Sequence, residues 1–381
     1  MKSFTRFAAT AAVALAASAV FVSSASAAAG RPGPAWSGAG HAVFVQTDNL
    51  SGNSVVAYQR AADGTLTQAG TYSTEGLGGM LTGSVVDHLA SQGSLTYDPQ
   101  HDLLYAVNAG SNTVSVFSVS GDRLALRQVV KSGGTFPVSV AVHGDLVYVL
   151  NALNGGSIQG FVVLGGHLVS VPSWNRGLNL DPTATPQFVN TPGQVGFTAD
   201  GSQLVVTTKA NGSNIDVFRL GWLGAPAAAP VVTNEPGAVP FSFVNDGANR
   251  LYLTEAGTDA VATVTVNADG TVTQDAISAT GQAATCWIAS TGDLVFADNA
   301  GSADVSGYQA GATGALTSLG TTSTDGGTVD AAVSSDGHYL YTQTGAGGIV
   351  DEFKIGAHGS LTELGSLTVP GGVGGEGIVA F

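Results

Sequence analysis

The stretch LLYAVNAGSNTVSVF, residues 103–117, returns as LVFADNAGSADVSGY at residues 294–308, with Leu, Ala, Asn-Ala-Gly-Ser, Val and Ser in register. The third position of this stretch holds an aromatic or apolar residue, and equivalent positions recur along the chain at intervals of about 43 to 61 residues. A period of this length is typical of the blades of a β-propeller. The seven occurrences are Phe44, Tyr105, Tyr148, Val205, Tyr252, Phe296 and Tyr341.

Each repeat has the pattern of four short strands. Val114 and Val116 alternate with Ser115, as in a strand, and no window of useful length shows the 3.6-residue period of a helix. The polar turns between strands often contain Asp-Gly, as at residues 200–201. The sequence therefore predicts an all-β fold over residues 41–381, a single seven-bladed β-propeller with four-stranded antiparallel blades.

The two ends of this region complement each other. The segment HAVFVQTD, which begins at His41, matches a second strand and has no innermost strand before it. Residues Glu376–Phe381 look like the missing first strand. We therefore expect the C-terminal strand to pair with the N-terminal blade and close the ring, which removes two exposed strand edges.

The first forty residues have a different character. Lys2 and Arg6 precede a run of small apolar residues from Phe7 to Val22, which ends in Ala25-Ser26-Ala27. This pattern predicts a signal peptide over residues 1–27 and a secreted, extracellular protein that starts at residue 28. A retained membrane anchor is the alternative, although the run is short for a spanning helix. Residues 28–40 form a Gly/Pro-rich leader.

Charge and cysteine content exclude several partners. The chain has 27 acidic and 12 basic residues, a net charge of -15, and no basic cluster. We therefore expect no nucleic-acid partner and no membrane insertion after signal cleavage. The single cysteine, Cys286, cannot form an internal disulfide and is expected to be a small buried side chain. We expect a monomer.

Metal binding is constrained by the distribution of histidines. In a propeller, the loops that join blades and the loops between second and third strands lie on one face, which we call the top face. The Asp-Gly turns lie on the opposite, bottom face. His88 is in a top loop, whereas His101, His143 and His338 fall in bottom turns. Because zinc and iron sites need several such ligands together, we expect no cofactor, and only a structural calcium ion remains open.

Polar residues of the top loops are the candidate ligand-binding residues. Converging polar groups at the mouth of a channel form the default ligand site. The alternative is a water-filled channel with solvated acids. The candidates are Asp87, His88, Gln92, Arg176, Gln194, Lys209, Glu235, Asp330 and Glu376.

The segments FPVSVAVHGDLVYVLN (136–151) and SSDGHYLYTQ (334–343) resemble the lactonase family of seven-bladed propellers. That family includes bacterial 6-phosphogluconolactonases and fungal carboxymuconate lactonizing enzymes (3-carboxymuconate cyclase-like proteins). The segments SQGSL (91–95), AVNAGSNTVSVF (106–117) and ATCWIA (284–289) are similar to a secreted actinobacterial branch of it. The resemblance covers essentially all of residues 41–381 and implies chemistry on an anionic lactone.

The residues that carry out the family's chemistry are replaced in this chain. The family has Gly-Pro-Arg-His at the start of a blade and Asn-Glu one strand later. Here Gly193 stands for the arginine, Gln194 for the histidine, Thr208 for the asparagine and Lys209 for the glutamate, and an earlier histidine is Val138. Glycine and glutamine supply neither a fixed positive charge nor proton transfer near neutral pH.

Two functions remain open. The first is a secreted propeller without the family's catalytic residues that binds a small molecule, glycan or protein at its top face. The second is an extracellular lactone hydrolase or cyclase with a rebuilt active site.

Overall fold

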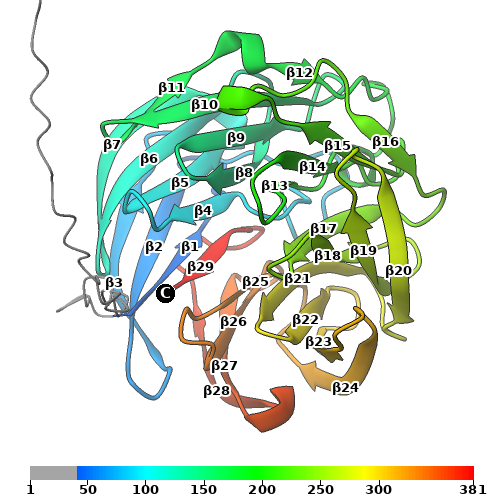
Figure 1. Cartoon of the computed structure of the whole chain (residues 1–381). Helices are drawn as coiled ribbons and strands as arrows, with labels where there is room; N and C mark the ends of the chain where they lie inside the picture. Colours follow the sequence, from blue (N-terminus) through cyan, green and yellow to red (C-terminus); the bar gives the residue numbers. More distant parts are fainter. Residues whose placement is uncertain (1–40) are drawn as a thin grey trace, which may run out of the picture. The chain divides into compact units, whose positions relative to one another are not determined.

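Residues 41–381 of this computed structural model form seven antiparallel sheets arranged around a central axis (Figure 1). Six sheets have four strands, and the sheet of the third blade has a fifth, short strand. The predicted all-β, seven-bladed fold is confirmed. The signal peptide (1–27) and the leader (28–40) lie outside the described residues. Between residues 41 and 381, no helix is long and apolar enough to span a membrane.

The strands follow one another blade by blade, from the innermost to the outermost strand of each sheet. The first blade contains β1 (Ala42–Gln46), β2 (Ser54–Arg60) and β3 (Leu66–Ser73); the second β4 (Leu95–Asp98), β5 (Leu103–Asn108), β6 (Thr113–Ser120) and β7 (Arg123–Lys131); the third β8 (Pro137–His143), β9 (Leu146–Asn151), β10 (Ser157–Leu164), β11 (His167–Ser170) and β12 (Arg176–Gly177).

The remaining blades have the same order. The fourth contains β13 (Val195–Phe197), β14 (Gln203–Thr207), β15 (Asn214–Arg219) and β16 (Val231–Asn234); the fifth β17 (Pro240–Asn245), β18 (Arg250–Glu255), β19 (Ala260–Val266) and β20 (Val272–Ala279); the sixth β21 (Thr285–Thr291), β22 (Leu294–Asn299), β23 (Asp304–Ala310) and β24 (Leu316–Ser323); the seventh β25 (Thr328–Val333), β26 (Tyr339–Thr344), β27 (Ile349–Ile355) and β28 (Leu361–Thr368).

The repeated residues explain why the blades form and pack. All seven aligned aromatic or apolar residues lie in second strands, and each is at most 3% exposed. They fill the spaces between neighbouring blades, as Phe296 does against Leu340 of the next blade. The repeated asparagine has one role in both copies of the opening motif: Asn108 donates to Ser115 Oγ (2.8 Å), and Asn299 donates to Ser306 Oγ (2.9 Å).

The ring closes through its two ends, as predicted. Strand β29 (Ile378–Ala380) pairs antiparallel with β1 and becomes the innermost strand of the first blade. Phe381 extends this pairing, because its backbone exchanges two hydrogen bonds with Ala42 (2.9 and 3.0 Å). The Phe381 ring also stacks on Tyr97 of the second blade, with 4.5 Å between the ring centroids.

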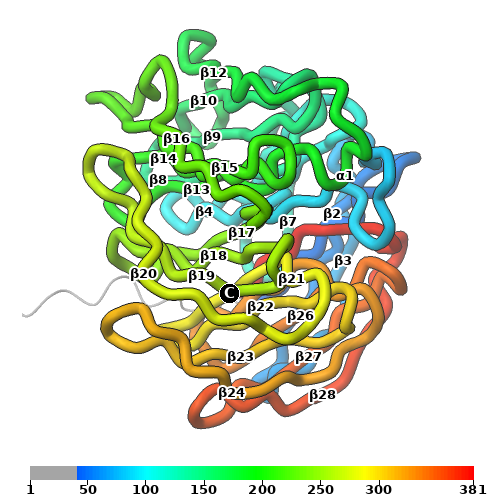
Figure 2. Tube along the Cα trace, turned by 90° about the vertical axis from the view of Figure 1, so that its right-hand side faces the viewer, coloured from blue at the N-terminus to red at the C-terminus, as the bar shows by residue number. Residues whose placement is uncertain are grey.

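The long connection from β3 to β4, residues 74–94, covers the top face and then enters the ring. It lies beside the short helix α1 (Gln187–Asn190) at the same end of the ring (Figure 2). The Phe188 backbone N–H donates to the Thr82 carbonyl, and the Thr82 N–H donates to the Gln187 side chain. The last part of this connection, residues Asp87–Gly93, crosses the axis, and we call it the plug.

Candidate functional site

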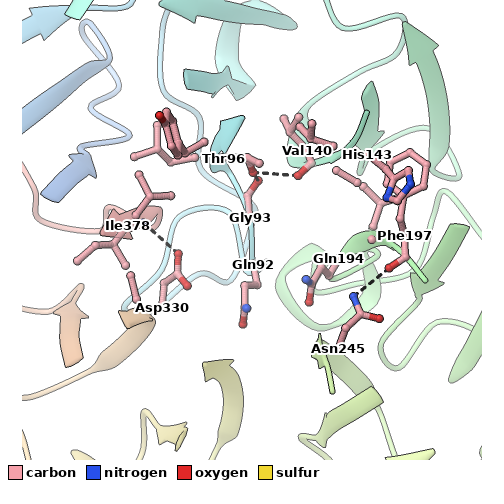
Figure 3. A pocket seen from close by; sticks show the side chains of 18 of the residues that line it. Gln92, Gly93, Thr96, Val140, His143, Gln194, Phe197, Asn245, Asp330 and Ile378 are labelled. Atoms are coloured by element: carbon pink, nitrogen blue, oxygen red, sulfur yellow. Dashed lines mark hydrogen bonds between the residues drawn. The ribbon is translucent and has the colours of Figure 1, made fainter. Parts of the chain in front are cut away.

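An axial cavity of about 520 Å³ lies on the bottom side of the plug (Figure 3). Its wall consists mainly of innermost strands, whose inner edges pair with no other strand in their sheets. Gln92, Gln194 and Asp330 lie at its plug end, and Tyr97, His143 and Asn245 lie at the bottom end. The cavity is therefore a pocket that is closed at the top and lined by strand edges.

The plug is held by blades on several sides of the axis. The Gln92 side chain donates to the Ile288 carbonyl (2.9 Å) and accepts from the Ile288 N–H (3.0 Å), so it continues the edge of β21. The Trp287 indole N–H donates to the Ser91 carbonyl (2.5 Å). On the opposite side, Ser91 Oγ donates to the Val138 carbonyl (2.9 Å) of the third blade. Through these bonds, the plug blocks the top end of the central channel.

Lys209 is buried against the plug, although it is a lysine. It is 1% exposed, and its ammonium group donates to the carbonyls of Ala90 and Phe188. Burial lowers the pKa of Lys209 to about 7, and nearby Asp87 partly opposes this shift. Both donor bonds serve backbone carbonyls, so Lys209 anchors the plug to the fourth blade.

Four carboxyl groups surround the same region. Asp48, Asp87, Asp330 and Glu376 are each at most 4% exposed. Burial raises the pKa of Asp48 to about 8, of Asp87 to about 6 and of Asp330 to about 7, and it raises the pKa of Glu376 well above its ordinary value. The other carboxyl groups of the cluster add to the shift in Glu376. Asp48 and Glu376 are therefore mainly uncharged near neutral pH.

Backbone and hydroxyl donors satisfy these carboxyl groups. Asp48 accepts from the Glu376 N–H (2.9 Å), and Asp330 accepts from the Ile378 N–H (3.1 Å). Asp87 accepts from the Leu89 N–H (2.7 Å), which shapes the start of the plug. The cluster thus joins the plug to the strand that closes the ring.

Gly193, Gln194 and Val138, which the resemblance aligns with catalytic residues of the family, lie in tightly packed or hydrogen-bonded positions. The Gln194 side chain donates to the Phe243 carbonyl (3.1 Å) and accepts from the Phe243 N–H (2.7 Å), as Gln92 does with Ile288. A Cβ atom at Gly193 would lie 2.4 Å from the Phe241 carbonyl oxygen, so no side chain fits there without a backbone shift. Val138 is fully buried.

The other candidates lie apart from the cavity. His88 is half-buried, with Nδ1 3.5 Å from the Asp48 carbonyl, and burial lowers its pKa. Arg176 lies on β12 at the outer part of the third blade, where its guanidinium group donates to four backbone carbonyls. Glu235 follows β16, and burial raises its pKa to about 7. The structure therefore brings together Asp87, Gln92, Lys209, Asp330 and Glu376 around the plug, with Gln194 on the cavity wall.

The side chains of residues 41–381 bear on two further kinds of chemistry, metal binding and catalysis by the thiol of Cys286. No three His, Cys, Asp or Glu side chains in this range are arranged to hold a metal ion. Burial raises the pKa of the Cys286 thiol to about 12, which opposes formation of a nucleophilic thiolate. Cys286 packs with Phe241, Trp287 and Val329.

Sequence reasoning missed three participants. Asp48 joins the carboxyl cluster from the turn after β1, and Ser91 lies at the centre of the plug. The sequence predicts a bottom-face position for His143 but no role in a site; in the structure His143 lines the cavity and packs on Phe197. The length of the β3–β4 connection was the one available signal, because a loop of about twenty residues without strands is uncommon in a compact domain.

Comparisons with known proteins agree with this architecture. The family model described as "Lactonase, 7-bladed beta-propeller" matches residues 23–174. The comparison with curated proteins gives no match. Among solved structures, a putative 6-phosphogluconolactonase from Bacteroides fragilis is 19% identical, with a TM-score of 0.70, and the alignment covers 91% of this chain and 99% of the other.

A periplasmic gluconolactonase from Pseudomonas aeruginosa is 17% identical, with a TM-score of 0.72 and coverage of 89% of this chain and 98% of the other. At these identities the solved structures establish a shared fold. The predicted resemblance is confirmed: the chain is a seven-bladed β-propeller that matches the lactonase family over residues 23–174.

Proposed function

We propose that this protein is an exported lactonase-type propeller that binds a small, uncharged polar molecule, such as a sugar, in its axial cavity. The observation that carries the proposal is the position of the plug. It fills the top of the axis and leaves a cavity on the other side. A volume of about 520 Å³ is in the range of small-molecule pockets.

The lining of the cavity supports an uncharged polar ligand. Edge strands carry unpaired backbone N–H and C=O groups, which suit a molecule with several hydroxyl groups. The side chains of Thr96, Gln194 and Asn245 add neutral donors and acceptors, and no lysine or arginine lines the cavity. An anionic ligand would find no lysine or arginine side chain there to pair with.

Calorimetric titration with monosaccharides and sugar lactones tests this proposal. Ala141 lines the cavity, so Ala141→Leu should fill part of it and weaken binding at least about tenfold. The matched control is Ala125→Leu, which makes the same change at an exposed position of β7 and should bind as the wild type does. Equal affinity in both variants would show that the ligand binds elsewhere.

Lactone hydrolysis within the same cavity is the second candidate, and Asp330 is the observation that favours it. Its carboxyl group lines the cavity with its pKa raised to about 7 by burial, which suits a group that accepts and returns a proton near neutral pH. Turnover of sugar lactones or muconolactones that is lost in Asp330→Asn, with binding retained, would support it. Binding without turnover in the wild type would leave the binding function alone.

Export is supported by the signal-like pattern of residues 1–27. The similar Pseudomonas aeruginosa protein is described as periplasmic. Intact-mass measurement of protein from the culture medium should give a chain that begins at Ala28. A mass that includes residues 1–27, found in the membrane fraction, would contradict export with cleavage.

A further inference from the structure

The ring holds the plug much as a receptor holds a bound peptide. The Lys209 ammonium and the Trp287 indole N–H donate to the successive carbonyls of Ala90 and Ser91. The next residue, Gln92, pairs through its amide with the backbone of β21.

Innermost strands supply the remaining contacts. The Gln92 N–H donates to the Gly193 carbonyl (3.2 Å), and the Val140 N–H donates to the Gly93 carbonyl (2.8 Å). Peptides that bind to sheet edges are recognised in this way, by main-chain hydrogen bonds with a pocket for a side chain.

The contact between the plug and the ring also has an uncommon backbone conformation on both sides. Ala90 has φ +52° and Lys209 has φ +55°, and these two residues are joined by a hydrogen bond. Asp330, beneath the plug, has φ +50°.

We propose that the centre of the ring is a binding site for a short, bent peptide with an amide side chain, and that the plug occupies this site in cis and can be displaced from the top face. The plug forms the top wall of the small-molecule cavity through Gln92 and Gly93, but the bonds that hold it do not involve a molecule bound in the cavity, so the proposal does not rest on the function proposed above. A peptide is favoured over a small acid for two reasons. The ring bonds successive main-chain carbonyls, those of Ala90 and Ser91, and it also bonds the side-chain amide of the next residue, Gln92.

The buried thiol of Cys286 reports whether the plug leaves on its own. Cys286 is the single cysteine of the chain, and it packs beside Trp287, which holds Ser91, and against Val86, which precedes the plug. Labelling with an aromatic disulfide reagent should therefore require opening of this region. In the full mature chain we expect labelling at a rate that changes little between 0 and about 1 M urea, because local opening exposes little surface. A rate with the same urea dependence as global unfolding would overturn the proposal.

A variant of the plug tests whether a peptide replaces it. Gln92→Gly removes the amide that pairs with Ile288 and should speed labelling of Cys286 at least about tenfold. The control Gln59→Gly makes the same change at an exposed position on β2 and should label as the wild type does.

The acetylated and amidated peptide Leu-Ala-Ser-Gln-Gly, which copies the sequence of residues 89–93, should then slow labelling of Gln92→Gly at millimolar concentration. The peptide Leu-Ala-Ser-Gly-Gly should not. Equal effects of the two peptides, or none from either, would overturn the proposal. If the variant does not fold, the same two peptides are compared on the labelling of Cys286 in the unmodified chain, where the same outcomes support or overturn the proposal.

Discussion

The two ends of the axial channel are built from the same innermost strands, yet they differ in what fills them. At the top, the plug forms hydrogen bonds with several blades, and Lys209 and Glu376 are at most 1% exposed. At the bottom, the strand edges face an open cavity. The difference shows that a convergence of polar residues, which the sequence predicts for the top, can form a buried network as readily as a binding site.

Removing the strand that both ends share should have the largest effect. A chain truncated before Glu376 loses β29 and the carboxyl group that bonds the plug at Ser91. We expect the free energy of unfolding to fall by at least about 5 kcal/mol, as in the most severe core truncations. Urea titration measures it, with Val373→Ala, an exposed site, as control. A loss below about 1 kcal/mol would contradict the role of β29 in closure.

Lys209→Met probes the top end alone. The change leaves the carbonyls of Ala90 and Phe188 without their donor inside the fold. We expect a loss of about 3 kcal/mol, because each unpaired buried carbonyl costs about 1 to 3 kcal/mol. Lys354→Met, on the exposed side of β27, should change stability by less than about 0.5 kcal/mol. Similar urea midpoints for the two variants would mean that the plug does not depend on Lys209.

The carboxyl cluster should make stability fall as pH rises. The pKa values of Asp48, Asp87 and Asp330 are raised by folding, so the folded chain holds protons that the unfolded chain releases near pH 4. Their contribution is complete below pH 4 and is lost as pH rises toward about 8. Lys209, with its pKa lowered to about 7, acts in the opposite direction, but it is one group against several.

We therefore expect the free energy of unfolding to fall by at least about 2 kcal/mol between pH 5 and pH 8. Urea titrations across this range measure it. The slope should be shallower in Asp330→Asn, which cannot ionise at this position. A slope that is the same in Asp330→Asn and the wild type would show that Asp330 does not contribute to the pH dependence of stability.

The smallest effect is expected at the bottom end. His101 lies between Asp98 (2.8 Å) and Asp145 (3.0 Å), which belong to neighbouring blades. Burial alone would lower the pKa of His101, but Asp98 and then Asp145 raise it. The ion pairs stabilise the fold at low pH and are lost as pH rises through the raised pKa. His101→Gln should therefore cost less than about 1 kcal/mol at pH 5.5 and nothing measurable at pH 9. If His101→Gln still lowered the free energy of unfolding at pH 9, the effect would come from lost side-chain packing rather than from the ion pairs.

Local patterns predicted the blades because local patterns form them. Tyr105 and Phe296 each lie in a strand that can be recognised from a few neighbouring residues. The turns between strands can likewise be recognised from a few neighbouring residues. Closure was also visible, since the missing inner strand had a single candidate in Glu376–Phe381.

The site depended on contacts between distant parts of the sequence. The partner of Lys209 is the carbonyl of Ala90, and any residue has a carbonyl, so no residue type indicates this bond. The plug sequence Ala-Ser-Gln-Gly has no period of a strand or helix. Sequence placed Asp330 and Glu376 at the start of innermost strands, but the covering loop that buries them follows from the path of the β3–β4 connection.

The hydrogen bonds that radiate from the plug change how the repeats depend on one another. In an array of repeats, each unit contacts its two neighbours alone, and unfolding can begin in one unit and spread. Here residues 90–93 bond to the third, fourth and sixth blades at once. A loss of packing in the sixth blade should therefore also weaken the hydrogen bond between Ser91 and the third blade. We therefore expect all seven blades to unfold in one cooperative transition.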